Sequence, residues 1–142
     1  MKIQVKSLIE GWTGISAPAK QLDSGFDMIV SEDTIIPPHG TTPTNVPCGS
    51  CIKLPEGHHA VVITRSGANK RGIQALPGLI DEAYTGPLYA ICYNHTDSEI
   101  LVKKGERVAQ LLIQNRITPE LEWVEALPET ERASSGFGST GM

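Results

Sequence analysis

The chain has 142 residues, a length typical of a single domain that can bury a substantial core. Aromatic residues make up only 5% of it and charged residues 20%, so the core is expected to be mainly aliphatic. The formal net charge of -4 argues against a general nucleic-acid-binding surface, which would be basic.

The first residues, 1–12, carry lysines among alternating apolar residues and contain no apolar run typical of a signal peptide. No other stretch is long and apolar enough to span a bilayer. We therefore expect a cytoplasmic protein with neither a membrane nor a nucleic acid as partner.

Strand signals dominate the rest of the chain. Residues 3–9 alternate between apolar and polar, and short apolar runs between Gly/Pro turns follow at 26–30, 51–54, 60–64, 88–93, 100–102, 108–113 and 121–124. Many short strands of this kind are typical of a β-sandwich or barrel. Residues 108–114 have a helical alternative, but their turn-like flanks favour a strand. Helix is predicted only around residues 66–70, for one or two turns.

The cysteines and histidines give a weak metal signal. Cys48 and Cys51 have the spacing of a redox or zinc half-site, but a zinc ion would need two further ligands. Only Cys92 and four scattered histidines remain, and the segment lacks the strand-to-helix context of a thioredoxin motif. We expect ordinary reduced thiols, and we expect His58 and His59 to lie at a strand edge.

Two segments in the middle of the chain suggest a ligand site. Arg65, Ser66 and Gly67 place a cation, a hydroxyl and free N–H groups at a helix start, which favours an anion. Residues 78–86 are predicted to form a hairpin with a glycine at each end, whose backbone can meet the edge of a base.

Within this predicted hairpin, Asp81 stands beside the apolar Leu79 and Ile80. Partial desolvation there would make it a better general base near neutral pH. The structural alternatives are that Asp81 caps a turn and that Tyr84 is a core residue.

The last third of the chain adds a buried polar residue and a glycine-rich tail. Gln110 lies among apolar neighbours and needs either a structural partner or a ligand. Beyond residue 125 the chain has little to bury except Phe137, so it is expected to be mobile. Its glycines would let the backbone wrap an anion, Arg132 could clamp a phosphate and Phe137 could stack on a flat ring. The alternative is a flexible terminus without a role.

Together, and in this order, these segments resemble the dUTPase family. The five motifs of that family appear at residues 24–28 (SGFDM), 65–67 (RSG), 78–86 (GLIDEAYTG), 105–110 (GERVAQ) and 132–141 (RASSGFGSTG). The third and fifth motifs are the specific ones. Ala133 and Ser135 replace two glycines usual in the fifth motif, which could stiffen the arm or forbid a positive φ. Pro87 stands where the family often has an acidic residue, and Thr64 where proline is common.

The resemblance implies an all-β, jelly-roll-like distorted barrel over residues 1–125 and a flexible C-terminal arm over 126–142 that closes over an active site. It also implies a homotrimer with three sites at subunit contacts. Each site would take the first, second and fourth motifs from one chain, the third from a second chain and the arm from the third.

The implied reaction is hydrolysis of dUTP to dUMP and pyrophosphate, which limits uracil in DNA and supplies dUMP for thymidylate synthesis. Asp81 would deprotonate a water that attacks the α-phosphorus, with Asp27 acting toward Arg65 or the waters of the metal. Mg²⁺ would be the cofactor, held mainly by the triphosphate and by no protein ligand directly. The implied substrate-binding residues are Arg65, Ser66, Gly67, Gly78, Ile80, Tyr84, Gln110, Arg132, Phe137, Gly138 and Ser139.

Selectivity would come from shape and from polar groups left without partners by the wrong base. The backbone near Gly78 and Ile80 would pair with the edge of uracil, and a snug hairpin would exclude the methyl of thymine. The ring of Tyr84 under the sugar would leave no room for a 2′-hydroxyl. Arg132 would reach the terminal phosphate, and Phe137 would close over the base.

Two other functions compete with this one. A dCTP deaminase shares the implied fold but carries a catalytic glutamate on the strand after the hairpin, and residues 88–94 contain no carboxylate. A nucleotide-responsive binding protein could keep the same site for signalling. Assays of ammonia release from dCTP and of dUTP turnover separate these possibilities.

Overall fold

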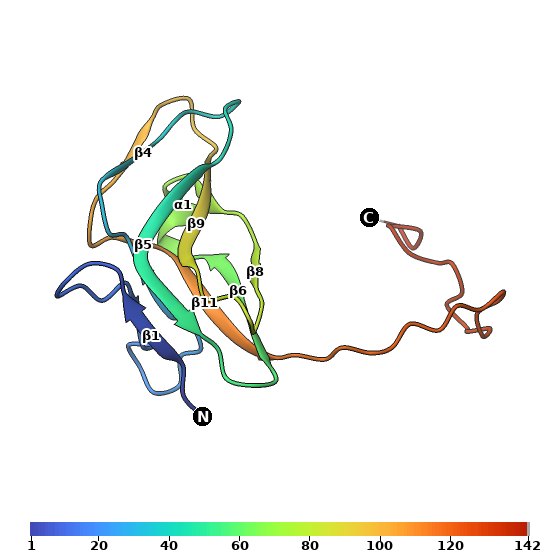
Figure 1. The fold of residues 1–142 in the computed structure, drawn as a ribbon. Helices are drawn as coiled ribbons and strands as arrows, with labels where there is room; N and C mark the ends of the chain where they lie inside the picture. The colour runs from blue at the N-terminus through green and yellow to red at the C-terminus, as the bar shows by residue number, and fades with distance from the viewer. Residues whose placement is uncertain (142) are drawn as a thin grey trace.

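The computed structural model describes residues 1–141, and nearly all of its regular structure is antiparallel sheet (Figure 1). A four-stranded sheet has the order β1 (Gln4–Ser7), β5 (Thr44–Lys53), β9 (Pro87–Asn94) and β7 (Ile73–Ala75). A five-stranded sheet has the order β2 (Ile15–Ser16), β3 (Phe26–Ile29), β11 (Arg107–Asn115), β6 (His58–Thr64) and β8 (Gly78–Ile80). A two-stranded ribbon joins β4 (Thr34–Ile36) to β10 (Ile100–Val102). The all-β, jelly-roll-like fold is confirmed.

The core lies between the sheets and is aliphatic, as the composition predicts. In β9 the burial alternates, so that Leu88, Ala90 and Cys92 are buried while Tyr89 and Ile91 face outward. This period of two is what pleated backbone requires of a half-buried strand. The largest fully buried side chains are Met28, Ile36, Leu54, Ile73, Leu88 and Leu111.

Most of the predicted elements are present. The described strands β1, β3, β6, β9, β10 and β11 correspond to the runs predicted at 3–9, 26–30, 60–64, 88–93, 100–102 and 108–113, and the predicted helical turn is α1 (Ser66–Lys70). This five-residue helix is far too short to cross a membrane, and no helix within residues 1–141 is long and apolar enough to do so.

The prediction of strands needs correction in three respects. The predicted run at 51–54 overlaps the end of a ten-residue strand, β5. The first half of β5 was not predicted because it contains polar residues and Pro47. The short strands β2, β4 and β7 were not predicted. Residues 121–124 form no strand: Trp123 is 91% exposed, and no strand of the described chain pairs with this segment.

The segment 78–86 is not a paired hairpin, which corrects another prediction. Its first strand, β8, pairs with β6 at the edge of the five-stranded sheet, whereas the following β9 pairs with β5 and β7 in the other sheet. The chain therefore crosses between sheets here, turning at residues 81–84 through a hydrogen bond from Tyr84 N to Asp81 O of 3.0 Å. As a result one backbone edge of β8 has no strand beside it in the described chain.

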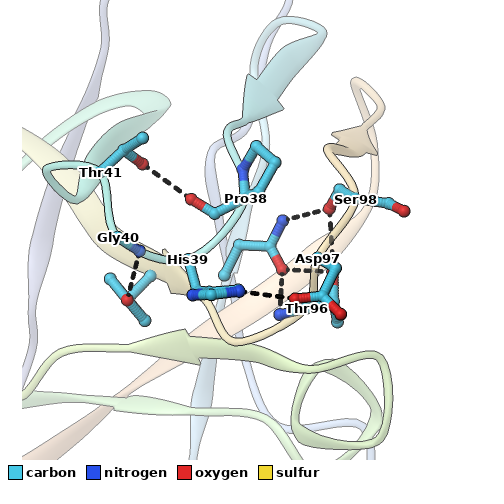
Figure 2. A network of polar contacts seen from close by, with 9 residues as sticks. Pro38, His39, Gly40, Thr41, Thr96, Asp97 and Ser98 are labelled. Atoms are coloured by element: carbon cyan, nitrogen blue, oxygen red, sulfur yellow. Dashed lines mark hydrogen bonds and ion pairs between the residues drawn. The ribbon is translucent and has the colours of Figure 1, made fainter.

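A polar network fixes the far end of β9. The fully buried Asn94 donates to the carbonyls of Ile36 (3.1 Å) and Ser98 (2.7 Å) and accepts from the N–H of Thr96 (2.8 Å). Figure 2 shows how His39, which pairs with Asp97 at 2.6 Å, ties the loop after β4 to the loop after β9. These hydrogen bonds satisfy buried polar groups, which would destabilise the fold if they had no partner.

The three cysteines are free and buried, as expected of reduced thiols. The spacing of Cys48 and Cys51 reflects an irregularity in β5, where the pairing with β9 shifts and Gly49 has a φ of +70°. A bulge often uses a glycine in this conformation. His58 and His59 lie at the start of β6, where they bond to Glu56 O and to the side chain of Gln114.

This burial predicts slow thiol chemistry. Loss of solvation raises the pKa of Cys48 to about 11 and that of Cys92 to about 12. A pKa of about 11 in place of the usual 9.0 lowers the thiolate fraction near pH 7 about 100-fold. We therefore expect iodoacetamide to leave both thiols of the native protein unmodified over hours, as read by intact mass, and to modify them quickly in denaturing urea.

The same shifts set a dependence of stability on pH. Between pH 9 and about 11 to 12, unfolded thiols release protons that the folded state retains. The free energy of unfolding should therefore fall as the pH rises through this range. Rapid modification of native Cys48 near pH 7 would contradict its description as a buried thiol with a raised pKa.

Candidate functional site

A cationic hollow lies between α1 and the start of β11. It has a volume of about 310 Å³ and is lined by Arg65, Gly67, Ala68, Arg71, Gly105, Glu106, Arg107 and Val108. Asp27 on β3 holds two of the arginines: its Oδ1 lies 3.1 Å from Arg65 Nε, and its Oδ2 lies 3.4 Å from Arg107 Nε. Each guanidinium carries five N–H donors, so both keep donors for an anion.

Arg107 was missed by the sequence reasoning. It lies within the fourth motif, but its importance comes from Asp27, which is distant in sequence and reaches it because β11 pairs with β3. The sequence feature that could have identified Arg107 is its position directly after a turn, at the start of a strand. Asp27 contacts Arg65 as well, and the side chain of Asp27 is only 18% exposed.

Ser66 and Gly67 begin α1 at the edge of this hollow. A Cβ added at Gly67 would meet no atom of its own chain within 4 Å. The fold of the single chain therefore does not itself require glycine there, and the open space is available to a ligand or a partner.

Gln110 connects the first and fourth motifs. It lies opposite Asp27 on β3 and opposite Ile63 on β6, on the outer face of the five-stranded sheet. A Cβ at Gly25 would lie 1.9 Å from Gln110 Oε1, so glycine is needed at position 25 for the amide to lie there. The side chain of Gln110 therefore does not face the core, and it needs no buried hydrogen-bond partner within the fold.

A second pocket, of about 230 Å³, lies between β8 and β9. It is lined by Asn45, Leu79, Ile80, Asp81, Tyr84, Pro87, Leu88, Tyr89 and Ile91. We call it the β8–β9 pocket.

Tyr84 is fixed at the mouth of this pocket and is not a core residue, since it is 43% exposed. Its hydroxyl donates to Pro87 O at 2.8 Å. A Cβ at Gly86 would lie 2.6 to 3.1 Å from the hydroxyl and ring atoms of Tyr84, so the tyrosine ring can lie across position 86 only because it is glycine.

Asp81 is exposed in the single chain, which corrects the expectation that Leu79 and Ile80 desolvate it. Those side chains belong to an edge strand and do not cover the carboxylate. Within residues 1–141 the Asp81 carboxylate accepts no hydrogen bond from the chain, so it does not cap the turn either.

The neighbouring Glu82 behaves in the opposite way. It accepts from Gly57 N at 3.0 Å and from Arg116 Nε at 2.9 Å, and these contacts lower the pKa of Glu82. Of the two adjacent carboxylates, that of Glu82 is held by its own chain, whereas that of Asp81 makes no hydrogen bond within residues 1–141.

After β11 the chain leaves the barrel and extends away from it (Figure 1). In this arm Arg132 Nε donates to Ser135 O at 2.7 Å, and Ser139 N donates to Gly136 O at 2.9 Å around Phe137 and Gly138. Ala133 adopts a φ of +48°, so alanine does not forbid a positive φ there, contrary to one of the two effects expected.

Of the predicted site residues, Arg65 and Gly67 line the cationic hollow, Ile80, Asp81 and Tyr84 line the β8–β9 pocket, and Arg132, Phe137, Gly138 and Ser139 lie in the arm. Ser66 lies between two lining residues of the hollow in the sequence, Gln110 follows the lining residue Val108 on β11, and Gly78 lies in β8 but lines neither cavity. The hollow and the pocket share no lining residue. Within residues 1–141, no three His, Cys, Asp or Glu side chains gather in a group that could hold a metal ion.

Comparisons with known proteins agree with the motifs. The family model for dUTPase matches residues 13–141. A deoxyuridine 5′-triphosphate nucleotidohydrolase from Paramecium bursaria Chlorella virus 1 is 39% identical, over 97% of this chain and 96% of its own length. One from Oryza sativa is 38% identical, over 99% of this chain and 81% of its own. The structure of Staphylococcus bacteriophage 80alpha dUTPase with dUPNHPP has a TM-score of 0.85 and 27% identity, with 99% of each chain covered.

Proposed function

Because this chain belongs to the dUTPase family, we propose that it hydrolyses dUTP by attack of water on the α-phosphorus, with Asp81 as the general base. The observation that supports this assignment is the exposed Asp81 carboxylate at the β8–β9 pocket, which makes no hydrogen bond or ion pair within residues 1–141. A base must be able to reach the proton that it takes. The Asp81 carboxylate can approach a water without first breaking a bond to the protein.

The phosphates would lie in the cationic hollow. Arg65 and Arg107, oriented by Asp27, would neutralise charge on the triphosphate, and Ser66 and Gln110 would bond to its oxygens. Attack at phosphorus is mainly a problem of positioning and charge neutralisation. A guanidinium pair fixed by one carboxylate is suited to that task because it needs little rearrangement when the substrate binds.

The base would enter the β8–β9 pocket. The backbone edge of β8 that has no strand beside it within residues 1–141, around Gly78 and Ile80, would pair with the edge of uracil. The Tyr84 ring, fixed by its bond to Pro87 O, would lie under the deoxyribose and exclude a 2′-hydroxyl. A wrong base would leave buried polar groups without partners, which discriminates strongly.

Magnesium is the cofactor that we propose. The Asp27 oxygens are both occupied by arginines, so this carboxylate fits a role behind the phosphates better than one as a direct metal ligand. The cation would be held mainly by triphosphate oxygens and water, and it would supply the positive charge that an acidic chain lacks.

We further propose that the active protein is a homotrimer with composite sites. On one chain the cationic hollow and the β8–β9 pocket are separate, and the arm extends away from the barrel. The segment after β11 also exposes large apolar side chains, namely Ile117, Leu121, Trp123, Val124 and Leu127. Exposed apolar residues in such number suggest an interaction surface. A second chain would cover them, and it would also desolvate Asp81.

One assay tests the proposed function. Pyrophosphate release measured with dUTP, dTTP, dCTP and UTP should give a kcat/KM for dUTP at least about 100-fold above each of the others. Equal turnover of UTP would contradict the role of Tyr84, and ammonia released from dCTP would indicate a deaminase. Binding of dUTP without turnover would indicate a signalling protein.

The cellular role that we propose follows from the reaction. Hydrolysis of dUTP would limit uracil in DNA and would provide dUMP for thymidylate synthesis.

Mixed trimers test the composite site. An Asp81→Asn chain and a chain truncated after residue 127 should each be inactive alone. After joint unfolding and refolding at equal amounts, about a quarter of the sites should join an intact Asp81 to an intact arm from another chain. Activity near that fraction is expected in pyrophosphate release. Mixed trimers, verified by native mass, that stay inactive would show that one chain supplies both elements.

A further inference from the structure

One wall of the β8–β9 pocket carries a polar residue that the proposed mechanism does not use. Asn45 on β5 lines the pocket together with Tyr89 and Ile91 on β9. Asn45 lies directly opposite Ile91 in the sheet, and Tyr89 is the next outward-facing residue along β9. The three side chains therefore share the outer face of the four-stranded sheet.

The position is an unusual one for asparagine. Asn is disfavoured in strands, where β-branched and aromatic residues pack better, and its cross-strand neighbour here is Ile91. Asn45 is exposed, and within residues 1–141 its amide makes no hydrogen bond to another side chain or to the backbone. The fold of the chain thus gives this amide no structural task.

The pocket supplies what the amide lacks. Its volume of about 230 Å³ lies below the range of roughly 300–1,000 Å³ usual for drug-sized ligands, as suits a single ring. Its lining is largely aliphatic or aromatic, and in such pockets a few placed polar groups fix the orientation of the ligand. The lining residues include Leu79 and Ile80 of the edge strand β8 and Asn45 of β5, so backbone and side-chain groups of different strands meet at this pocket.

We propose that Asn45 is a further base-binding residue, whose carboxamide hydrogen-bonds to a polar edge of the pyrimidine in the β8–β9 pocket. The amide has two donors and an acceptor, which complement the alternating carbonyl and N–H groups of a pyrimidine. The inference rests on the proposed function and extends it: the base is held by a side chain from β5 in addition to the backbone of β8.

The test separates base binding from phosphate binding. Calorimetry with dUMP and with inorganic tripolyphosphate is run on the full-length protein, on Asn45→Leu and on Asn45→Asp, which keeps the size of the side chain and removes both donors. The matched control is Asn115→Leu, an exposed strand asparagine that lines neither the hollow nor the pocket. Light scattering checks the mass of each variant.

Both Asn45 variants should bind dUMP about tenfold more weakly, the loss expected for one hydrogen bond in a pocket, and tripolyphosphate within about twofold of wild type. The KM for dUTP should rise about tenfold with kcat within about twofold, and Asn115→Leu should change neither. If Leu prevents folding, the Asp variant decides.

Unchanged dUMP affinity, an equal loss for tripolyphosphate, or a variant that has lost its native mass would overturn the proposal; the last result would place Asn45 in a subunit contact. Wild-type turnover of dUTP is measured separately, so a failure of the proposed function is distinguishable from a failure of this inference.

Discussion

Replacing Asp81 by asparagine is expected to lower dUTP hydrolysis about 1,000-fold or more while leaving the Kd for dUTP within about tenfold of wild type. An amide keeps the shape of the carboxylate but cannot take a proton, and general bases typically contribute factors of about 10² to 10⁴. Because the Asp81 side chain makes no hydrogen bond or ion pair within residues 1–141, the loss should be one of rate, with the melting temperature unchanged. Single-turnover pyrophosphate release and calorimetry measure the two quantities.

The control for this change is Asp97→Asn. Asp97 is also an exposed loop aspartate, with a side chain 94% exposed, but it pairs with His39 in the loops beyond the far end of β9 (Figure 2). Its substitution should leave kcat and KM as they are. An Asp81→Asn protein that turns over dUTP at the wild-type rate would rule out the base assignment.

Truncation after residue 127 should reduce kcat/KM severely, by about 100-fold or more, because Arg132 and Phe137 would no longer contribute to a closed site. The melting temperature should stay nearly constant, since Phe137 is fully exposed and little buried apolar area is lost. In the intact protein, dUTP with magnesium should protect the arm from protease, as followed by intact mass.

Glu131→Gln serves as the matched control for the arm, because it changes a charge next to Arg132 and removes no proposed contact. Its activity should match that of wild type within about twofold. Full activity of the truncated protein would return the arm to the interpretation of a flexible terminus without a role.

The sequence predicts this fold well wherever the signal is local. The short apolar run of residues 88–93 and the turn residues around it predict β9, and a helical turn is predicted around residues 66–70, where α1 lies. The assignment of β8 to one sheet and β9 to the other is not local, because it depends on which strands lie alongside them in three dimensions. A paired hairpin was therefore the natural prediction from the sequence, and it was wrong.

The candidate site shows the same division. Arg65 and Asp81 carry recognisable chemistry in short motifs, so they could be named from the sequence. Arg107 contacts Asp27 on another strand, and the role proposed for Asn45 depends on the pocket that residues of β5, β8 and β9 form together, so neither residue could be named from its own segment. The solvation of Asp81 also depends on residues beyond its own segment, which no local pattern reports.

The length of the segment between β11 and Arg132 has a consequence for how strongly the arm must bind. From Asn115 to Arg132 the chain can span at most about 60 Å when fully extended, and a flexible chain of that length has a root-mean-square reach of about 20–25 Å. Groups tethered in this way experience an effective concentration in the millimolar range. Arg132 and Phe137 therefore need only weak intrinsic affinity for the nucleotide to close the site, and an arm that binds weakly can also release the product quickly.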